Sequence, residues 1–549
     1  MRRIILLLGG LVICYSSFAQ PLNGSKKFSH QDTLRGSIGP GRDWWDVKQY
    51  SIYVIPDYDS KTTSGWTDIQ FAVTKTVRNQ SMQIDLQQPL HLDSAFCEGK
   101  KIKGVRQDGN AWFLELPTPS LKASAKNLTL RVYYSGKPVS ARRPPWDGGW
   151  VWAKDKKGRP WMTVACQGLG ASVWYPCKDH QSDEPDNGAV LQMLVPDTLV
   201  AVANGRKKDE KNMGNGKKLF TWEVKNPINN YNIIPYIGHY VNWSEKFDGE
   251  KGALDCNYWV LDYDLEKARE QFGRDVKPML KAFEFWFGPY PFYEDGFKLI
   301  EAPHLGMEHQ SAIAYGNDFK NGYRGNDLSK TGWGLKWDFI IVHESGHEWF
   351  GNNITTKDLA DMWVHEGFTN YSETLFTDFN FGKEAGNAYC LGTRALIQND
   401  IPIKGPYGVN QEGSGDMYYK GGNLVHTLRQ LVNDDEKFRQ ILRGLNKTFY
   451  HQTVTSTQVE NYISEKIGMD LSKVFFQYLS TTQIPVLEYK IDGNRVSYRW
   501  TDCVEGFNLP VKLQGVGLWV RPTQQWQETT LPEGGFTVDP NFYIKTKAS

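Results

Sequence analysis

The sequence predicts a multidomain protein with an N-terminal β domain, a mostly helical α+β domain and a small C-terminal β-sandwich. Three observations indicate this fold class. Apolar and polar residues alternate at period two from about 45 to 255, apolar residues recur with helical spacing from about 264, and alternation returns near Ile484-Pro485. A length of 549 residues suggests about three or four domains. We therefore expect a signal segment and three domains, at 1–19, 40–258, 259–482 and 483–549.

The N-terminus has the residue order of a secretory signal peptide. Arg2 and Arg3 precede an apolar run from Ile4 to Ile13, and small residues lead to a cleavage site after Ala19. About ten apolar residues are too few to span a bilayer, and no later run of 18 apolar residues exists. We expect an exported protein, periplasmic or extracellular, with no stable membrane insertion after cleavage.

The β domain is predicted from short alternating runs. Leu128, Leu130, Val132 and Tyr134 are apolar, whereas Thr129 and Arg131 between them are polar. Clusters of Gly, Asn, Asp and Pro separate this run from others of the same kind. The similar runs are at 50–55, 112–116, 190–195, 199–203 and 219–224. Together they indicate a large antiparallel β domain.

Helical spacing begins near Asp264, and either Asp262 or Asp264 can act as the N-cap. Apolar residues three or four apart continue to Phe287, and Gly288-Pro289 then ends the pattern. Further helical patterns lie at 335–350, 362–380, 417–432, 435–445 and 456–480. After Pro485 two alternating runs flank the turn Asp492-Gly493, which predicts a hairpin within the β-sandwich.

The charge balance, the composition and the cysteine content argue against several classes of protein. The chain has 63 basic and 62 acidic residues, so no basic excess suggests a nucleic-acid partner. With 40% hydrophobic and 23% charged residues, it is not a mainly disordered chain. Seven Cys are too few for a disulfide scaffold, and none of the six beyond the signal segment forms a metal-like pair.

The sharpest motif is H-E-x-x-H, from His343 to His347, in the helical region. Residues four apart lie on one helix face, so both imidazoles can reach one metal ion. Zinc accepts imidazole nitrogens and a carboxylate, which leaves a fourth position for water. Glu344 lies about 100° round the same helix, where it can take a proton from the metal-bound water.

The third ligand is predicted to be a carboxylate from the next helix. Glu366 fits, with 18 residues between it and His347. Glu373 lies two turns further along the same face and could orient a ligating imidazole. The alternative is that the two histidines are solvated on an exposed helix. That alternative does not explain why a glutamate follows His347 at this spacing. By contrast, no motif spacing marks His304 or His365 as a ligand, so both are predicted to be ordinary polar residues.

The segment from His343 to Phe368 resembles the aminopeptidase N family of zinc metallopeptidases. That family has H-E-x-x-H, eighteen residues, and then Glu within N-E-G-F; His365 stands here in place of the usual Asn. The resemblance implies a saddle-like β domain, a thermolysin-like catalytic domain and a β-sandwich. It also implies one Zn2+ per chain, bound by His343, His347 and Glu366.

A second resemblance concerns the segment from Leu305 to His309, which is similar to the family's G-x-M-E-N motif. Leu305 and His309 depart from the motif, whereas Met307 and Glu308 match it. The resemblance implies that Gly306, Met307 and Glu308 bind substrate. A carboxylate near the metal can accept a charge-assisted hydrogen bond from a free N-terminal ammonium. The alternative is that Glu308 is a plain surface carboxylate.

Two further segments resemble the family. Gln167, before the aromatic-Pro-Cys run that ends at Cys177, resembles a residue facing the substrate amine, and Gln at this place is similar to the leukotriene hydrolase branch. Cys177 is then a core residue rather than a nucleophile. Tyr418 begins a run that resembles Y-x-K-G, and its hydroxyl would donate to the oxyanion. The neighbouring Tyr419 is the alternative donor.

These predictions describe a zinc-dependent aminopeptidase that hydrolyses the N-terminal residue from peptides. Its catalytic residues would be Glu344 and Tyr418, and its partners peptides with a free N-terminus. Three alternatives stay open: a zinc endopeptidase without the ammonium anchor, an epoxide hydrolase on the same fold, and a non-catalytic binding protein.

Overall fold

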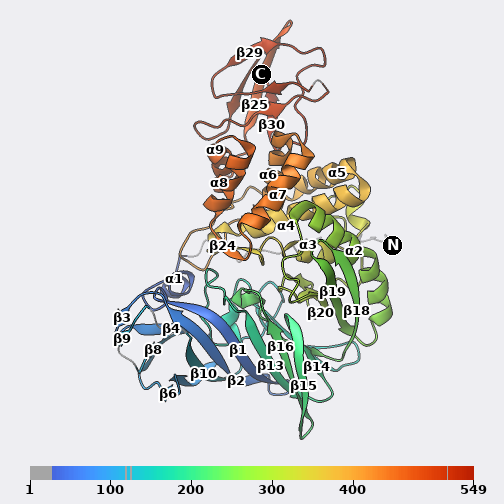
Figure 1. Cartoon of the computed structure of the whole chain (residues 1–549). Coiled ribbons are helices and arrows are strands. Elements are labelled where there is room, and N and C mark those ends of the chain that lie inside the picture. Colours follow the sequence, from blue (N-terminus) through green and yellow to red (C-terminus); the bar gives the residue numbers. More distant parts are fainter. Residues whose placement is uncertain (1–26, 118–119, 124–126, 516) are drawn as a thin grey trace, which may run out of the picture.

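The computed structural model describes residues 27–117, 120–123, 127–515 and 517–549. The predicted signal peptide, 1–19, lies outside these residues, so export stays a prediction. Figure 1 shows a β domain at one end, the helices in the middle and a small β unit at the other end. The first described element is a short helix, α1 (His30–Gly36), capped by Ser29. No helix in the described part is long and apolar enough to cross a membrane.

The N-terminal β domain contains a large eight-stranded sheet, in the order β15-β16-β13-β1-β2-β10-β5-β6. Its members are β1 (Trp45–Asp57), β2 (Thr62–Val73), β5 (His91–Cys97), β6 (Lys100–Lys101), β10 (Leu128–Gly136), β13 (Ala189–Pro196), β15 (Arg206–Gly214) and β16 (Lys217–Val224). Alternate residues of β1 and β10 are buried, as period two requires. The pairing is antiparallel except between β1 and β13, which run parallel, so the expectation of a wholly antiparallel domain was wrong at this one pair.

Smaller sheets pack against the large one. The four-stranded sheet has the order β11-β12-β17-β14, the three-stranded sheet has the order β4-β8-β7, and β3 and β9 form a two-stranded sheet. The strands are β3 (Val77–Arg78), β4 (Ser81–Asp85), β7 (Val105–Asp108), β8 (Ala111–Glu115), β9 (Ser120–Leu121), β11 (Gly149–Lys154), β12 (Pro160–Ala165), β14 (Val200–Val202) and β17 (Tyr236–Gly238). Their apolar faces share one core that is rich in tryptophan and tyrosine.

A five-stranded sheet joins the β domain to the helices. Its order is β18-β19-β20-β22-β21, with β21 at one edge. The strands are β18 (Tyr240–Gly249), β19 (Gly252–Leu261), β20 (Phe297–Glu301), β21 (Gly306–Met307) and β22 (Ile313–Tyr315). Alternate residues serve different cores: Tyr258 packs with the helices, whereas Trp259 packs with the β domain. The predicted domain ranges stay a prediction, but the boundary at 258/259 falls inside β19.

The helical region contains α2 (Leu265–Phe287), α3 (Phe339–Gly346), α4 (Trp363–Phe381), α5 (Lys383–Thr393), α6 (Tyr419–Val432), α7 (Asp435–Thr448), α8 (Ser456–Ile467) and α9 (Ser472–Ser480), with the short strands β23 (Ile354–Thr356) and β24 (Gln452–Val454). Helices α2 and α3 pack against the five-stranded sheet, and α3 and α4 carry the H-E-x-x-H motif and Glu366. The helix expected at 335–350 is shorter, because Asp338 caps it. The run 456–480 is two helices, because Gly468 adopts a left-handed conformation at φ +83°.

The C-terminal unit contains the predicted hairpin. Strands β25 (Val486–Asp492) and β26 (Arg495–Thr501) pair antiparallel around Gly493 and Asn494. The remaining strands are β27 (Val511–Lys512), β28 (Trp519–Val520), β29 (Gln527–Thr530) and β30 (Lys545–Ala548), which complete a four-stranded and a two-stranded sheet. This pairing agrees with the predicted β-sandwich.

Candidate metal centre and adjoining substrate site

Helix α3 presents the two histidines of the H-E-x-x-H motif. Asp338 starts the helix by accepting hydrogen bonds from the backbone of Ile340 and Ile341. The helix ends at Gly346, but His347 keeps helical backbone angles of φ −64° and ψ −20°. The four-residue spacing therefore still places both imidazoles on one face. One ligand atom from each of His343, Glu344 and His347 lies within 4.8 Å of the others.

Glu366 on α4 completes the donor set. Its Oε2 lies 3.3 Å from Nε2 of His347 and 3.8 Å from Nε2 of His343. All three side chains are buried, and Oε2 has no hydrogen-bond partner among the described residues. Burial would raise the pKa of Glu366, but the two imidazoles outweigh it and hold that pKa well below its usual range. An unpartnered buried oxygen facing two imidazole nitrogens fits a divalent cation, and this N,N,O set suits zinc.

The far nitrogens of both imidazoles are fixed by other groups. Nδ1 of His343 lies 2.7 Å from Oε1 of Glu373, whose other oxygen accepts a 2.6 Å hydrogen bond from Tyr389. Nδ1 of His347 lies 3.0 Å from the carbonyl oxygen of Phe350. These contacts direct both Nε2 atoms toward Glu366 and select the tautomer that a metal ion needs.

Glu344 lies directly under the edge strand β21. A Cβ atom added at Gly306 would come within 2.7 Å of Glu344 Oε1 and 2.9 Å of Ile340 Cγ2, so only glycine allows this approach. Met307, the other residue of β21, is buried beside it. Burial raises the pKa of the Glu344 carboxyl above its ordinary value. A buried carboxylate next to an open strand edge is well placed to exchange a proton with a bound substrate.

Glu308 follows β21 and is buried, with only 3% of its surface exposed. The alternative that it is a surface carboxylate is therefore wrong. Gln167 Nε2 donates a 2.6 Å hydrogen bond to Glu308 Oε1, and the Tyr231 hydroxyl donates to the same oxygen at 3.0 Å. Burial raises the pKa of Glu308. The sequence analysis missed Tyr231, because no motif marks a residue that approaches Glu308 from the β domain.

Tyr418 and Tyr419 occupy different surroundings. Tyr418 is the N-cap residue of α6, and its ring lies 6.0 Å from the ring of His343. Its hydroxyl makes no hydrogen bond within the described ranges. Burial, together with the charge of Glu366, raises the pKa of Tyr418 well above its usual value, so the hydroxyl keeps its proton. Tyr419 instead lies near Glu373 and Tyr323, whose charges act on its hydroxyl. Of the two, Tyr418 is the one whose pKa is raised by the charges of Glu366 and Glu344.

Glu412 is a second residue that the sequence analysis missed. It lies in the loop before Tyr418, half-buried, and no pattern in the sequence marks it. Desolvation raises its pKa to about 7, and the charges of Glu366 and Glu308 add to the shift. The site therefore holds one more titratable carboxyl group than the motif residues alone supply.

The remaining singled-out residues are structural. His365 is fully buried, and its Nε2 accepts a 2.8 Å hydrogen bond from the backbone of Thr356. Burial lowers the pKa of His365 to about 3. His304 is also buried, so both are polar core residues rather than surface ones. Cys177 is fully buried and burial raises its pKa, as expected of a core thiol.

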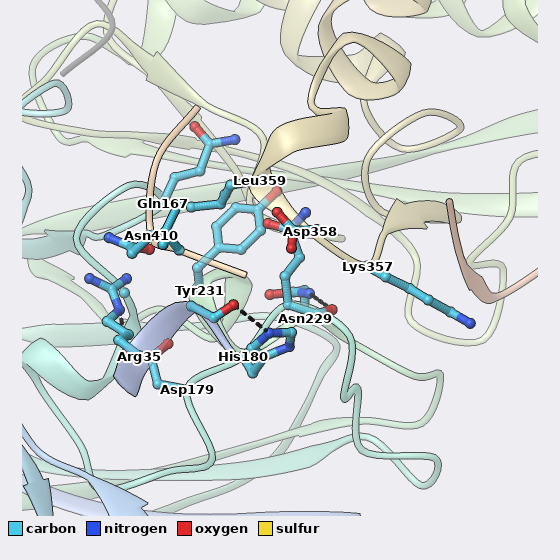
Figure 2. Close-up of a pocket in the computed structure, with 14 residues that line it drawn as sticks. Arg35, Gln167, Asp179, His180, Asn229, Tyr231, Lys357, Asp358, Leu359 and Asn410 are labelled. Atoms are coloured by element: carbon cyan, nitrogen blue, oxygen red, sulfur yellow. Dashed lines mark hydrogen bonds and ion pairs between the residues drawn. The ribbon is translucent and has the colours of Figure 1, made fainter. Parts of the chain in front are cut away.

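A small cavity of about 40 Å³ adjoins the Glu308 site. Gln167 and Tyr231, which hold Glu308, form part of its wall. Figure 2 shows Gln167, Asn410 and Arg35 along one side and Lys357 pointing away on the other. The cavity lies where α1, the β domain and two loops of the helical domain meet. Its other lining residues are Gly36, Gly170, Asp179, His180, Gln181, Asn229, Asp358, Leu359 and Val409.

Comparison with known proteins agrees with this site. The model of the peptidase family M1 domain matches residues 306–478, which include every predicted metal ligand. The likeness to this family therefore rests on the stretch that contains the predicted metal donors.

Individual relatives are distant. Over 437 residues the chain is 22% identical to probable aminopeptidase 1 of Sulfurisphaera tokodaii, covering 74% of this chain and 51% of that protein. It is 24% identical to rat (Rattus norvegicus) aminopeptidase B, covering 54% and 45%. It is also 24% identical to leukotriene A-4 hydrolase of Xenopus laevis, covering 61% and 55%. The chain thus spans about half the length of the curated relatives it matches.

A solved structure extends the likeness of the fold over most of the chain. A variant of a two domain M1 zinc metallopeptidase bound to L-tryptophan superimposes with a TM-score of 0.68 at 20% identity. The match covers 82% of this chain and 98% of that chain. The M1 zinc metallopeptidase of Deinococcus radiodurans superimposes with a TM-score of 0.66 at 21% identity.

Proposed function

We propose that this protein is a zinc-dependent aminopeptidase that removes the N-terminal residue from peptides. The observation that carries the proposal is Glu308, a buried carboxylate held by Gln167 and Tyr231 close to the three metal donors. A carboxylate can accept several hydrogen bonds, and both of these end on one oxygen. A substrate ammonium could therefore pair with the other oxygen, and the β domain behind Glu308 would stop a longer chain from passing.

Each residue of the centre has a role in this proposal. A Zn2+ ion bound by His343, His347 and Glu366 would supply a Lewis acid that polarises the scissile carbonyl and acidifies water. Glu344 would accept the proton from the attacking water and pass it to the leaving amine. The Tyr418 hydroxyl would donate to the oxyanion as charge develops there.

The edge strand β21 would position the substrate backbone. Gly306 and Met307 pair with β22 on one side only, which leaves the other edge of β21 open. An extended peptide can add to such an edge through main-chain hydrogen bonds. Gly306 lies directly over Glu344, so a peptide bound there would place its carbonyl beside the base.

The relatives support this choice of substrate. Two of them are named aminopeptidases, and the Deinococcus radiodurans metallopeptidase has been solved with a Tyr-Ser-Ala substrate. A panel of aminoacyl p-nitroanilides, with N-acetylated counterparts, tests the proposal directly. We expect cleavage of the free forms alone. Equal cleavage of acetylated peptides would favour an endopeptidase, and turnover of a lipid epoxide alone would favour an epoxide hydrolase.

Replacing Glu308 by glutamine is expected to lower kcat/KM for free aminoacyl amides by about 10- to 150-fold, mainly through KM. The reason is that a hydrogen bond between two charged groups contributes about 1.5–3 kcal/mol, which the neutral amide cannot supply. Steady-state kinetics on leucine p-nitroanilide measures the change. The exposed Glu384 on α5 provides a matched control, Glu384→Gln, which should behave as wild type. An unchanged KM in Glu308→Gln would contradict the anchor role.

Removing the metal is expected to abolish activity and to lower the melting temperature. A chelator leaves Glu366 buried with an unpartnered oxygen, and rebinding of zinc stabilises the folded state by about 2.7 kcal/mol at a hundredfold excess over Kd. Differential scanning calorimetry with and without zinc measures the shift. Glu366→Gln should show no zinc-dependent shift. A wild-type protein that stays fully active after exhaustive chelation would refute the metal centre.

A further inference from the structure

Helix α1 connects the β domain to the loop that precedes Tyr418. On one side, Gln31 Nε2 donates hydrogen bonds to Asp108 at the end of β7. On the other side, the backbone N–H of Asn410 donates a 3.1 Å hydrogen bond to the carbonyl of Asp32. The segment thus bridges the two halves of the molecule beside the cavity of Figure 2.

The carbonyl of Gly168 accepts hydrogen bonds from both sides of this bridge. Arg35 Nη2 of α1 donates to it at 3.3 Å, and Asn410 Nδ2 of the opposite loop donates at 3.2 Å. Gly168 directly follows Gln167, whose side chain donates to Glu308 at 2.6 Å. Arg35 and Asn410, which come from distant segments, therefore fix the backbone next to Gln167, the residue that donates to Glu308.

The packing around Arg35 keeps it in this position. Its Nε lies 3.5 Å from Oδ2 of Asp179, and only 19% of its side chain is exposed. At Gly170, which has φ +96°, an added Cβ would lie 2.2 Å from both Arg35 Nη2 and Asp179 Oδ2. At Gly36 an added Cβ would lie 2.2 Å from the backbone of Val409. The two glycines thus allow α1, the Gly168 segment and the 409–410 loop to come into direct contact.

We propose that Arg35 and Asn410 are positioning residues for the amine-binding group: by holding the Gly168 carbonyl they fix Gln167 against Glu308. This inference rests on the proposed function, because it gives Glu308 the role of ammonium anchor. Neither side chain needs to touch the substrate. Loss of either donor leaves Gln167 free to move, which weakens recognition of the α-amino group and leaves metal binding unchanged.

The test compares two ligands that differ only in the α-amino group. Alanine hydroxamate carries it and propionohydroxamate lacks it, while the metal-binding hydroxamate is the same. Isothermal titration calorimetry on the zinc-loaded full chain measures both Kd values without turnover. In Arg35→Met and Asn410→Ala, we expect the Kd of alanine hydroxamate to rise about three- to tenfold, as for loss of one hydrogen bond, and that of propionohydroxamate to stay constant.

The two variants come from different segments, so the proposal stays testable if one of them fails to fold. Arg495→Met is the matched control, because Arg495 is a largely exposed arginine on β26, in the C-terminal unit. If wild type binds both ligands equally, the ammonium site itself is wrong. If wild type prefers alanine hydroxamate and the variants keep that preference, or lose affinity for both ligands alike, the positioning role is wrong and the proposed function stands.

Discussion

Replacing Glu344 by glutamine is expected to lower kcat by about 100- to 10,000-fold while the chain keeps one zinc ion. The range is the usual contribution of a positioned general base, and an amide cannot accept a proton. The metal donors stay intact, because His343 and His347 are oriented by Glu373 and Phe350 rather than by Glu344. Kinetics on leucine p-nitroanilide, together with elemental analysis of the same sample, separates the two effects.

The geometry of Gly306 makes this substitution informative. Glutamine has nearly the same shape as glutamate, so it fits below β21, where even one added methyl group at Gly306 would collide with residue 344. A change in activity then reports proton transfer rather than repacking. Glu384→Gln, on the exposed surface of α5, serves as the control. If Glu344→Gln binds zinc normally and turns over at the wild-type rate, Glu344 is not the base.

The metal donors were predictable from the sequence because their geometry is local. A spacing of four residues on a helix fixes the relative position of His343 and His347 whatever the rest of the chain does. Glu366 required one further assumption, that a second helix returns beside the first, and α4 does so. Glu373 followed from the same helix periodicity. Two helix patterns and the short connection between them were therefore enough to predict the positions of four side chains, His343, His347, Glu366 and Glu373.

The amine-binding side of the site was not predictable in this way. Glu308 and Gln167 are 141 positions apart, and Tyr231 lies between them in sequence without any recognisable motif. Their meeting depends on how the β domain packs against the five-stranded sheet, which no local period encodes. Only the family resemblance singled out Gln167. Nothing singled out Arg35 or Asn410, whose contacts with Gly168 span 133 and 242 positions.

In the fold as well, features set by local sequence patterns were predictable, and pairings between distant segments were not. The alternating runs at β1, β10, β13 and β16 became strands because each strand buries one face against a core. The parallel pairing of β1 with β13 depends on the path of more than 100 intervening residues, so no local sequence pattern predicts it. Helix α5 was missed because its sequence contains two glycines and follows Gly382, which weakens the helical pattern.

Tyr418→Phe is expected to lower kcat by about 100- to 1000-fold with little change in KM. Loss of one hydrogen-bond donor to an oxyanion typically has this effect, because the bond forms only as charge develops in the transition state. Removing the hydroxyl should leave the fold intact, because the ring packs near His343 and the hydroxyl has no partner among the described residues. Single-turnover kinetics on leucine p-nitroanilide measures the loss in the chemical step.

Tyr419→Phe is the matched control, since it removes the same group one residue away. Tyr419 lies toward Glu373 and Tyr323, so this variant should keep kcat within a few-fold of wild type. The reverse pattern, with Tyr419→Phe impaired and Tyr418→Phe active, would assign the donor to Tyr419. If both variants are active, zinc and the backbone alone stabilise the oxyanion. The pair therefore tests the preference for Tyr418, at the start of α6, over its neighbour Tyr419.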